Sequence, residues 1–439
     1  MEVVKEHGSA FDALLHETRP VAAAFHRAGK RLYLVGGIVR DGLRGRQRLD
    51  LDIDLTSDAL PDEIEAIMTS LRPTALWLQG KRFGTIGARL VGPDGGDRAY
   101  EVTAHRSDSY ALASRKPEVA FSDNIVVDLS RRDFTVNAIA VDAMSPAGGA
   151  VLVDPFSGLD DLRHHRLRTP LDPEVSFSDD PLRMLRAARF VAGHELVADP
   201  ALLGAIHDLR ARLAIVSAER VRDEFSKLLL LPRPVAGLAL LARTTLLDVF
   251  AAPLCALGTD PALLDRVGVV LADCPDDLTL RLAVLFALAT RCAADVDTIA
   301  YDWAIGLRFA LDDCSRLRML LRLRTAFPDS SDLASVRGFV RQSGELSEAV
   351  QMLVRLTDGN EVRSASVRTA IQHLSAVEGL DMSPTLDGVA VMAHLGVGPG
   401  RSVGEALAML LDVRLREGRV GPDEERRLLD RWWAVHQKK

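Results

Sequence analysis

Two neighbouring stretches near the N-terminus decide the fold: LYLVGGIVRD at residues 32–41 and LDIDL at residues 51–55. The first is an apolar strand that runs into two glycines and then into a helix carrying Arg40. In the second, Asp52 and Asp54 alternate with apolar residues. Because side chains on a strand alternate between faces, both carboxylates point the same way. The pattern predicts an α/β domain with a carboxylate pair close to a glycine turn.

The carboxylate pair predicts a site for a divalent cation. Two carboxylates about 7 Å apart along a strand suit Mg²⁺, which prefers one or two carboxylates plus substrate phosphates to a cage made only of protein. Gly36 and Gly37 let backbone N–H groups approach a phosphate, and a helix N-terminus adds partial positive charge. Alternatively, Asp50, Asp52 and Asp54 form the solvated face of an amphipathic strand. The glycine turn beside them favours metal-assisted nucleotide chemistry.

A third acid, Glu101, lies in the alternating stretch AYEVTA at residues 99–104. If this strand lies beside the strand of Asp52 and Asp54, three carboxylates converge. Two metal ions held in this way would activate an attacking hydroxyl and stabilise the leaving phosphate oxygens of an in-line displacement. An isolated glutamate on an edge strand is usually only solvated, so the interpretation of Glu101 depends on its neighbours.

Composition places the chain among folded, water-soluble proteins. It has 439 residues, 48% hydrophobic and 26% charged, which exceeds a single core and predicts several domains. The net charge of −7 does not by itself indicate nucleic-acid binding. No run approaches the roughly 20 apolar residues of a membrane span, so we expect a cytoplasmic protein without a membrane partner. The four cysteines lack metal-type spacing and are expected to be reduced core thiols.

The periodicity of apolar residues changes along the chain. Up to about residue 160, short runs alternate as strands do, at residues 32–35, 51–55, 75–78, 85–91 and 98–104. Beyond about residue 170, apolar residues recur at helical spacing and strand candidates are few. The sequence predicts an α/β head followed by an all-helical remainder.

Six motifs, in the same order, resemble class II tRNA nucleotidyltransferases and bacterial poly(A) polymerases. They lie at residues 34–41, 52–59, 131–138, 154–158, 180–190 and 217–222. The resemblance implies a nucleotidyltransferase head with a small mixed sheet over residues 1–165 and a helical neck that recognises the nucleotide base over 166–235. It further implies a helical RNA-binding body over 236–380 and a helical tRNA-binding tail over 381–439. The implied reaction adds CCA to the tRNA 3′ end from CTP and ATP with Mg²⁺.

One role implied by the resemblance also follows from chemistry. Asp180 and Arg183 are spaced i, i+3 on a predicted helix and share a face. A carboxylate only accepts hydrogen bonds and a guanidinium only donates them. Cytosine and adenine present an amino donor beside a ring-nitrogen acceptor, whereas guanine and uracil present the reverse order. The pair therefore predicts acceptance of C and A. The alternative is an intrahelical ion pair.

The resemblance implies roles for further residues. Asp52 and Asp54 match metal ligands, although Asp50-Leu51-Asp52 has the same form and leaves the register open. The predicted catalytic residues are Asp52, Asp54 and Glu101. The predicted nucleotide-binding residues are Gly36, Gly37 and Arg40 at the triphosphate, Arg132, Asp133 and Asn137 in the motif that contacts sugar and phosphate, and Asp180, Arg183, Arg186 and Arg189 in the neck.

The choice between family members depends on the loop over residues 107–120. In the family this loop is long in enzymes that add the terminal A and short in those that stop at CC. It is close to full length here, which favours complete CCA addition over CC-only addition, while an A-adding enzyme remains an alternative. A poly(A) polymerase shares every head motif and remains an alternative, as does a non-catalytic RNA-binding module, against which the intact acidic motifs argue. The sequence carries no inference about oligomeric state.

Overall fold

The computed structural model describes residues 2–4, 8–46, 52–92, 95–109, 118–290 and 295–436. The chain divides into two compact units, Met1–Thr259 and Asp260–Lys439. Each unit is considered by itself. The finer division into head, neck, body and tail stays a prediction.

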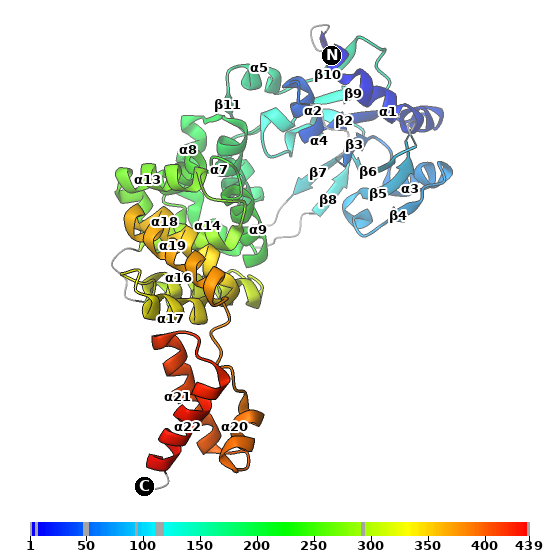
Figure 1. Ribbon diagram of the computed structural model, residues 1–439. Helices are drawn as coiled ribbons and strands as arrows, with labels where there is room; N and C mark the ends of the chain where they lie inside the picture. Colours follow the sequence, from blue (N-terminus) through cyan, green and yellow to red (C-terminus); the bar gives the residue numbers. More distant parts are fainter. Residues whose placement is uncertain are drawn as a thin grey trace. The chain divides into compact units, whose positions relative to one another are not determined.

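The first unit contains an eight-stranded mixed sheet with strand order β1-β10-β9-β2-β3-β6-β5-β4. Its strands are β1 Glu2–Val4, β2 Leu32–Val35, β3 Ile53–Ser57, β4 Ala75–Trp77, β5 Thr85–Val91, β6 Asp97–Ala104, β9 Ala140–Asp142 and β10 Ala150–Val153. Within this sheet β3 and β6 are parallel, and the other neighbours are antiparallel. Figure 1 shows β3 and β6 in the middle of this head. The predicted α/β head is confirmed.

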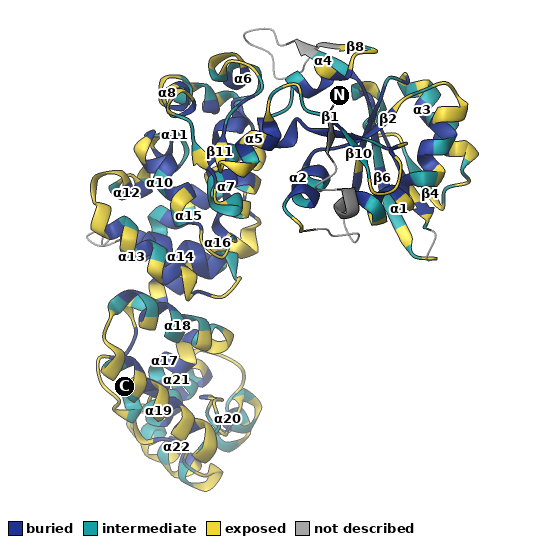
Figure 2. Cartoon of the chain, turned by 90° about the horizontal axis from the view of Figure 1, so that it is seen from above, coloured by how far each residue is buried: buried dark blue, intermediate teal, exposed yellow. Residues whose placement is uncertain are grey.

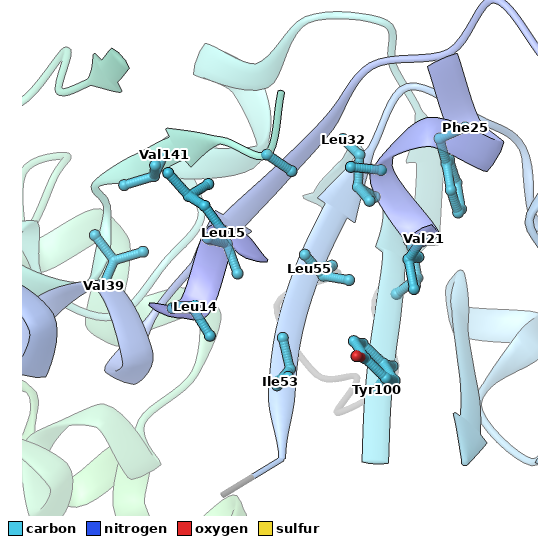
Figure 3. Packing of buried hydrophobic residues seen from close by; sticks show 14 of the residues in the cluster. Leu14, Leu15, Val21, Phe25, Leu32, Val39, Ile53, Leu55, Tyr100 and Val141 are labelled. Carbon is cyan, nitrogen blue, oxygen red and sulfur yellow. The ribbon is translucent and has the colours of Figure 1, made fainter. Parts of the chain in front are cut away.

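Alternation along the strands gives the sheet one large apolar face. The helix α1, Gly8–Arg27, lays Leu14 and Phe25 against this face, where Leu32, Ile53 and Leu55 are buried. Figure 3 shows these side chains packed together. Each fully buried side chain of this size contributes roughly 1.5–3 kcal/mol. The same alternation sends the side chains between them, including that of Asp54, to the opposite face.

The opposite face carries a smaller core and the site. Tyr33 and Val35 of β2 pack there with Ile125 and Leu129 of α4, Ile125–Ser130. Helices α2, Gly37–Leu43, α3, Pro61–Ser70, and α5, Gly158–Arg163, complete the head. Short 3₁₀ helices are η2 Lys81–Phe83 and η3 Thr135–Asn137. Because α4 covers only part of this face, polar side chains of β3 and β6 stay accessible.

The loop used to choose between family members lies between two paired strands. β7, Arg106–Ser109, pairs antiparallel with β8, Glu118–Phe121. Residues 110–117 lie outside the described residues. The inference drawn from the length of this loop therefore stays a prediction.

The rest of the first unit is mostly helical. Its helices are α6 Pro173–Asp179, α7 Leu182–His194, α8 Pro200–Leu209, η4 Arg210–Ile215, α9 Ala218–Leu229, α10 Val235–Arg243, α11 Leu247–Phe250, η5 Ala252–Leu254 and α12 Ala256–Thr259. One correction applies, because β11, Arg166–Leu167, and β12, Val197–Ala198, form a short parallel pair. Glu195 ends α7 in a left-handed conformation. The chain then turns back, and the N–H of Val197 donates to the carbonyl of His165.

The described part of the second unit contains helices and no strand. They are α13 Pro261–Ala272, α14 Leu278–Ala289, α15 Val296–Gly306, α16 Leu311–Thr325, α17 Leu333–Ser343, η6 Gly344–Leu346, α18 Ser347–Asp358, α19 Glu361–Val377, α20 Gly388–Leu395, α21 Arg401–Glu417 and α22 Pro422–His436. Nearly all of α14 is buried, as Figure 2 shows by its dark colour. The predicted helical remainder is confirmed here.

Two remaining expectations concern cysteines and membranes. Cys274 and Cys314 are buried, and burial raises the pKa of the Cys274 thiol to about 11. Cys255 is exposed, so its assignment to the core is wrong, and Cys292 lies outside the described residues. Within the described ranges, every helix is too short or too polar to traverse a bilayer.

Candidate active site

Two carboxylates lie side by side on neighbouring strands. Asp54 on β3 is paired directly with Glu101 on β6 in parallel register. Paired residues of adjacent strands point to the same face, about 5 Å apart. The expectation that these strands are neighbours is confirmed. Asp52 is exposed immediately before β3 begins, whereas Asp50 and Leu51 lie outside the described residues, so the choice between the two registers stays a prediction.

The electrostatics of Asp54 indicate a place for a cation. Burial by surrounding protein raises its pKa to about 6, and the negative charges of Glu101 and Asp52 add to the rise although Arg132 opposes it. Its side chain keeps access to solvent on one side. A charged Asp54 beside charged Glu101 is therefore unfavourable without a compensating positive charge.

The carboxylates fit a hard, oxygen-seeking ion. Among the described residues, no group of three or more His, Cys, Asp or Glu is arranged to hold a metal. Mg²⁺ does not require one, because it binds through one or two carboxylates and completes its shell with substrate phosphates and water. Asp54 with Glu101, and Asp52 at the strand entrance, supply that donor set.

Two adjoining cavities open at these carboxylates. The larger, about 330 Å³, is lined by Gly36, Gly37, Asp54, Arg131, Arg132, Asp133, Asn137, Asp180, Leu182, Arg183, Arg186 and Arg220. The smaller, about 210 Å³, is lined by Val35, Asp54, Leu55, Thr85, Glu101, Thr103, Arg106, Arg131 and Arg132. Asp54, Arg131 and Arg132 line both. Most of the predicted residues are thus brought together around one strongly basic space.

The glycine turn forms part of the wall beside Asp54. Gly36 has a φ of 76°, a conformation that L side chains rarely adopt. A Cβ atom at Gly36 would lie 3.5 Å from Nη1 of Arg132 and 3.7 Å from Oδ2 of Asp54. The absence of a side chain keeps this space open between the arginine and the carboxylate. Gly37 begins α2 and lines the same cavity.

Arg40 is paired within the protein. Its guanidinium is buried, donates to both carboxylate oxygens of Asp41 and to Oδ1 of Asn137, and lies over the ring of Phe190. It lines neither of the two cavities. The side chain follows the inner face of α2, so its connection to the cavity runs through Asn137. A contact of Arg40 with a triphosphate stays a prediction.

Asp133 and Arg186 form a fixed pair at the wall of the larger cavity. Oδ2 of Asp133 accepts from Nε and Nη2 of Arg186 at 3.0 and 2.6 Å, and Oδ1 accepts from Nδ2 of Asn137 at 3.0 Å. Burial by itself would raise the pKa of Asp133, but the charge of Arg186 and these hydrogen bonds outweigh it and lower the pKa to about 2. Asp133 is therefore an anion that orients its donors.

Arg189 is paired away from the two cavities. It donates to Oε1 of Glu224 on α9 and lies over Phe190, and it lines neither cavity. Glu224 is buried and also lies 3.9 Å from Arg186. A contact of Arg189 with nucleotide stays a prediction, and in this arrangement Arg189 connects α7 to α9.

The expected helical pairing of Asp180 and Arg183 is wrong. Asp180 is extended at the end of α6, and α7 begins at Leu182. The reason is Pro181, because a proline disfavours helical conformation in the residue before it and has no N–H to donate. The two side chains do line the same cavity.

Each member of this pair has its own partners. Oδ2 of Asp180 accepts from Nη2 of Arg220 at 2.9 Å, and Oδ1 accepts from the N–H of Leu182 at 3.2 Å. Arg183 is buried and donates from Nη1 to Oγ of Ser176 at 2.8 Å and from Nη2 to the carbonyl of Arg131. Both groups are therefore held in place before any ligand arrives.

Sequence reasoning missed several residues at or behind these cavities, among them Arg131, which lines both, Arg220 and Asp128. Arg220 lies in the motif at residues 217–222, but its contact with Asp180 joins α9 to the start of α7 and has no local signature. Asp128 is fully buried and accepts from both Arg131 and Arg132. A signal for Asp128 was present, because an acid inside the apolar run IVVDL precedes two arginines by three and four residues.

Comparisons with known proteins agree over most of the chain. The family described as "Poly A polymerase head domain" matches residues 32–168, and "Probable RNA and SrmB-binding site of polymerase A" matches residues 198–255. The CCA-adding enzyme of Limosilactobacillus fermentum is 30% identical over 414 residues, 92% of this chain and 93% of that protein. That of Lactobacillus helveticus is 37% identical over 210 residues, 48% of each chain. The matched region thus spans about half the length of several curated relatives.

Solved structures share the fold. The Bacillus stearothermophilus CCA-adding enzyme in complex with CTP has a TM-score of 0.73 at 24% identity, covering 98% of this chain and 99% of that one. The Thermotoga maritima CCA-adding enzyme complexed with tRNA_CCA has a TM-score of 0.64 at 19% identity, covering 95% and 94%. The matched region of this chain includes residues of both compact units in each comparison.

Proposed function

The chain belongs to the family of CCA-adding enzymes, and from that premise we propose that it adds C, C and then A to the 3′ end of tRNA, using CTP and ATP. The observation that carries the proposal is a single basic cavity in which Asp54 lies with Asp180 and Arg183. A carboxylate suited to metal-assisted transfer and a donor–acceptor pair suited to C and A face the same space.

The first component of the proposed reaction is a divalent ion, Mg²⁺, held by Asp52 and Asp54 with Glu101 beside them. When bound, the ion would polarise the reacting phosphate and lower the pKa of the attacking hydroxyl. Asp54 and Glu101 place negative charge at the point where the two cavities adjoin. A cation held there would in turn hold the reacting phosphate at that point. The raised pKa of Asp54 supports this role, because it reflects burial together with neighbouring negative charge that a cation would relieve.

The second component is the arginine cluster, which would neutralise the triphosphate. Arg131 and Arg132 line both cavities, and Nε of Arg132 is a buried donor without a partner in the described part of the chain. A buried donor left unsatisfied is costly, and an incoming phosphate or ribose oxygen would satisfy it. The open space above Gly36 gives that oxygen room beside Asp54.

The third component is base selection by Asp180 and Arg183. Only part of the hydrogen-bonding capacity of each is used within the protein, since a carboxylate has about four acceptor sites and a guanidinium has five N–H donors. Asp180 can therefore accept from the amino group of C or A while Arg183 donates to the neighbouring ring nitrogen. The bases G and U would place a donor against Arg183 and an acceptor against Asp180, which disfavours them.

The experiment uses purified full-length protein, Mg²⁺ and a tRNA that ends at the discriminator base. With CTP alone we expect two added nucleotides, and with CTP and ATP together we expect three followed by arrest. Product lengths are read on a sequencing gel. Addition that stops after two nucleotides with both substrates present would indicate a CC-adding enzyme, and extension only of tRNA already ending in CC would indicate an A-adding enzyme.

A poly(A) polymerase is the second candidate, and the family match over residues 32–168 favours it because that family is described by this activity. The two candidates differ in when extension stops. Long adenylate tails on unstructured RNA with ATP alone would establish the second candidate. Binding of RNA without any nucleotide addition would instead identify a non-catalytic RNA-binding protein. We expect the protein to act in the cytoplasm, where tRNA is processed.

A further inference from the structure

We propose that Asp128 is a positioning residue for nucleotide binding, which holds Arg131 and Arg132 at the cavity and ties them to the strand that carries Asp54. The inference rests on the proposed function, because its test measures nucleotide use. Asp128 lies on α4 and lines neither cavity, so it would act only through the two arginines.

The geometry around Asp128 is closed on every side. Its side chain is completely buried. Oδ1 accepts from Nε and Nη2 of Arg131 at 3.0 and 2.6 Å, and Oδ2 accepts from Nη2 of Arg132 at 3.0 Å. Charge-assisted hydrogen bonds of this kind are the strong and directional ones. One carboxylate therefore sets the orientation of both arginines that line both cavities.

A fourth contact connects this cluster to the carboxylate strand. Oγ1 of Thr56 lies 3.2 Å from Oδ2 of Asp128 and 3.0 Å from the carbonyl of Thr103, which is on β6. Thr56 follows Asp54 by two residues on β3, so both side chains point to the same face. Asp128 thus fixes the arginines relative to the strands that carry Asp54 and Glu101.

The cluster also reaches the base-recognition pair. The carbonyl of Arg131 accepts from Nη2 of Arg183. Because the side chain of Arg131 is held by Asp128, a change at Asp128 would also displace the Arg131 carbonyl to which Arg183 donates. The charge of Asp128 and its geometry predict opposite effects. Loss of its negative charge alone would make the cavity more attractive to a triphosphate, whereas loss of orientation would make binding weaker.

A matched control exists in the same unit. Asp161 is also fully buried and accepts from a threonine, Thr135, at 2.7 Å and from Nε of Arg168 at 2.9 Å, with Arg166 at 3.1 Å. These two arginines line neither of the two cavities. Asp161→Asn therefore removes a comparable buried charge without touching an arginine of the cavities.

The test compares Asp128→Asn with Asp161→Asn and the unchanged enzyme in steady-state CTP addition to tRNA, with thermal unfolding measured in parallel. We expect both variants to lose thermal stability to a similar degree. In Asp128→Asn the KM for CTP should rise by about tenfold or more, since orientation of two charge-assisted donors is lost. In Asp161→Asn the KM should stay within about twofold, because less folded enzyme lowers only the apparent kcat.

Other outcomes would overturn the inference. An unchanged KM in Asp128→Asn would mean that Asp128 serves folding alone, and a lowered KM would mean that only its charge matters. An equal rise in both variants would remove the link to the cavity. An unchanged enzyme that adds no nucleotide would refute the proposed function, which is a separate result.

A milder variant covers the case in which Asp128→Asn does not fold. Thr56→Val keeps the shape and removes only the hydroxyl that joins Asp128 to β3. We expect a smaller rise in the KM for CTP, about threefold, because only one hydrogen bond is lost and both arginines keep theirs. A folded Thr56→Val protein with the KM of the unchanged enzyme would contradict the connection between the cluster and the strand.

Discussion

Both compact units place a carboxylate between two arginines, but they leave different amounts of hydrogen-bonding capacity unused. In the second unit, Glu378 accepts from Arg337 and Arg414, and further N–H groups of these arginines donate to the backbone carbonyls of Asp381, Leu415 and Arg416. In the first unit, Asp128 holds Arg131 and Arg132, yet Arg132 retains a buried donor without a partner among the described residues. The same ion-pair arrangement can stabilise a fold when its donors are satisfied and can form a binding site when they are not.

The largest effect on activity should come from Asp54, the carboxylate that lines both cavities together with Arg131 and Arg132. Asp54→Ala is expected to lower CTP addition by about a thousandfold or more, because several kcal/mol of charge stabilisation depend on the metal it would hold. Thermal stability and tRNA binding should change little, since Asp54 lines a cavity and supports no packing. Rates are measured in single turnover and tRNA binding by filter retention.

The register of the metal site is tested alongside. Asp52→Ala should be nearly as inactive as Asp54→Ala, and Asp50→Ala should retain activity. Activity in Asp54→Ala close to that of the unchanged enzyme would refute the assignment of the carboxylates. Loss of activity in Asp50→Ala with Asp54→Ala active would shift the ligand pair by two residues.

The second largest effect concerns the satisfied cluster. Glu378→Gln leaves Arg337 and Arg414 buried without their anion, and removal of one partner of a buried ion pair costs about 3–5 kcal/mol. We expect this loss in the free energy of unfolding of the second unit, measured by urea denaturation followed by circular dichroism. The KM for CTP should be unchanged in the folded protein.

An exposed pair supplies the control for this measurement. Glu405→Gln breaks an ion pair with Arg401 on the surface of α21, which is worth at most about 0.5 kcal/mol. If Glu378→Gln destabilised the protein no more than Glu405→Gln, the inference that the Glu378 cluster stabilises the fold would be wrong.

A smaller effect is expected at Asp180. Asp180→Ala removes one charge-assisted hydrogen bond to the base and should cost about 1.5–3 kcal/mol in kcat/KM for CTP, roughly tenfold to a hundredfold. The use of UTP relative to CTP should rise, because the repulsion between Asp180 and the uracil carbonyl is lost. Arg220, which no longer donates to Asp180, becomes able to donate to that carbonyl. Relative kcat/KM values for the four nucleotides provide the measurement.

Asp223→Ala is the matched control for Asp180→Ala. Asp223 pairs with Arg222 on the same helix as Arg220 and lines neither cavity. Its removal should leave nucleotide preference unchanged. A uniform loss across all four nucleotides in Asp180→Ala would mean that Asp180 supports the start of α7 and reads no base.

The smallest effect is a pH dependence caused mainly by the burial of His194 at the end of α7. Burial, and then the charge of Arg40, lower the pKa of His194 to about 4 from an ordinary value near 6.5. The unfolded chain therefore takes up this proton first as the pH falls. The stability contributed by neutral His194 is fully present above about pH 6.5 and is lost as the pH falls towards 4, on the order of 1–2 kcal/mol.

Denaturation midpoints between pH 7 and pH 4 measure this contribution. His194→Gln should flatten the dependence over this range relative to the unchanged protein. A His194→Gln protein with the same slope would assign the acid sensitivity to other groups.

Local patterns predicted the strands of the head well, because alternation of apolar residues is a property of the sequence alone. The strand over residues 85–91 has the predicted bounds, and the strand at Leu32–Val35 does as well. The strand carrying Asp54 extends to Ser57 and not to Leu55, since buried Thr56 and Ser57 are polar and carry no apolar signal.

The site was harder to predict because side-chain direction depends on tertiary neighbours. The list of cavity residues was largely anticipated, yet Arg40 points to Asp41 and Asn137, which no periodicity indicates. The helical spacing of Asp180 and Arg183 misled because Pro181 interrupts the helix. Contacts between distant segments, such as that of Asp180 with Arg220, are invisible to any local rule.

Pro181 gives the proposed base-recognition pair, Asp180 and Arg183, a thermodynamic advantage that their contacts alone do not reveal. Its ring fixes φ near −60° at the junction between Asp180 and α7. The conformational entropy of ordering this junction is therefore lost when the chain folds, and little remains to be lost when a nucleotide binds. If this junction meets three incoming nucleotides in succession, as proposed, it need not be reordered for each one, and the hydrogen bonds of Asp180 would then serve discrimination in full.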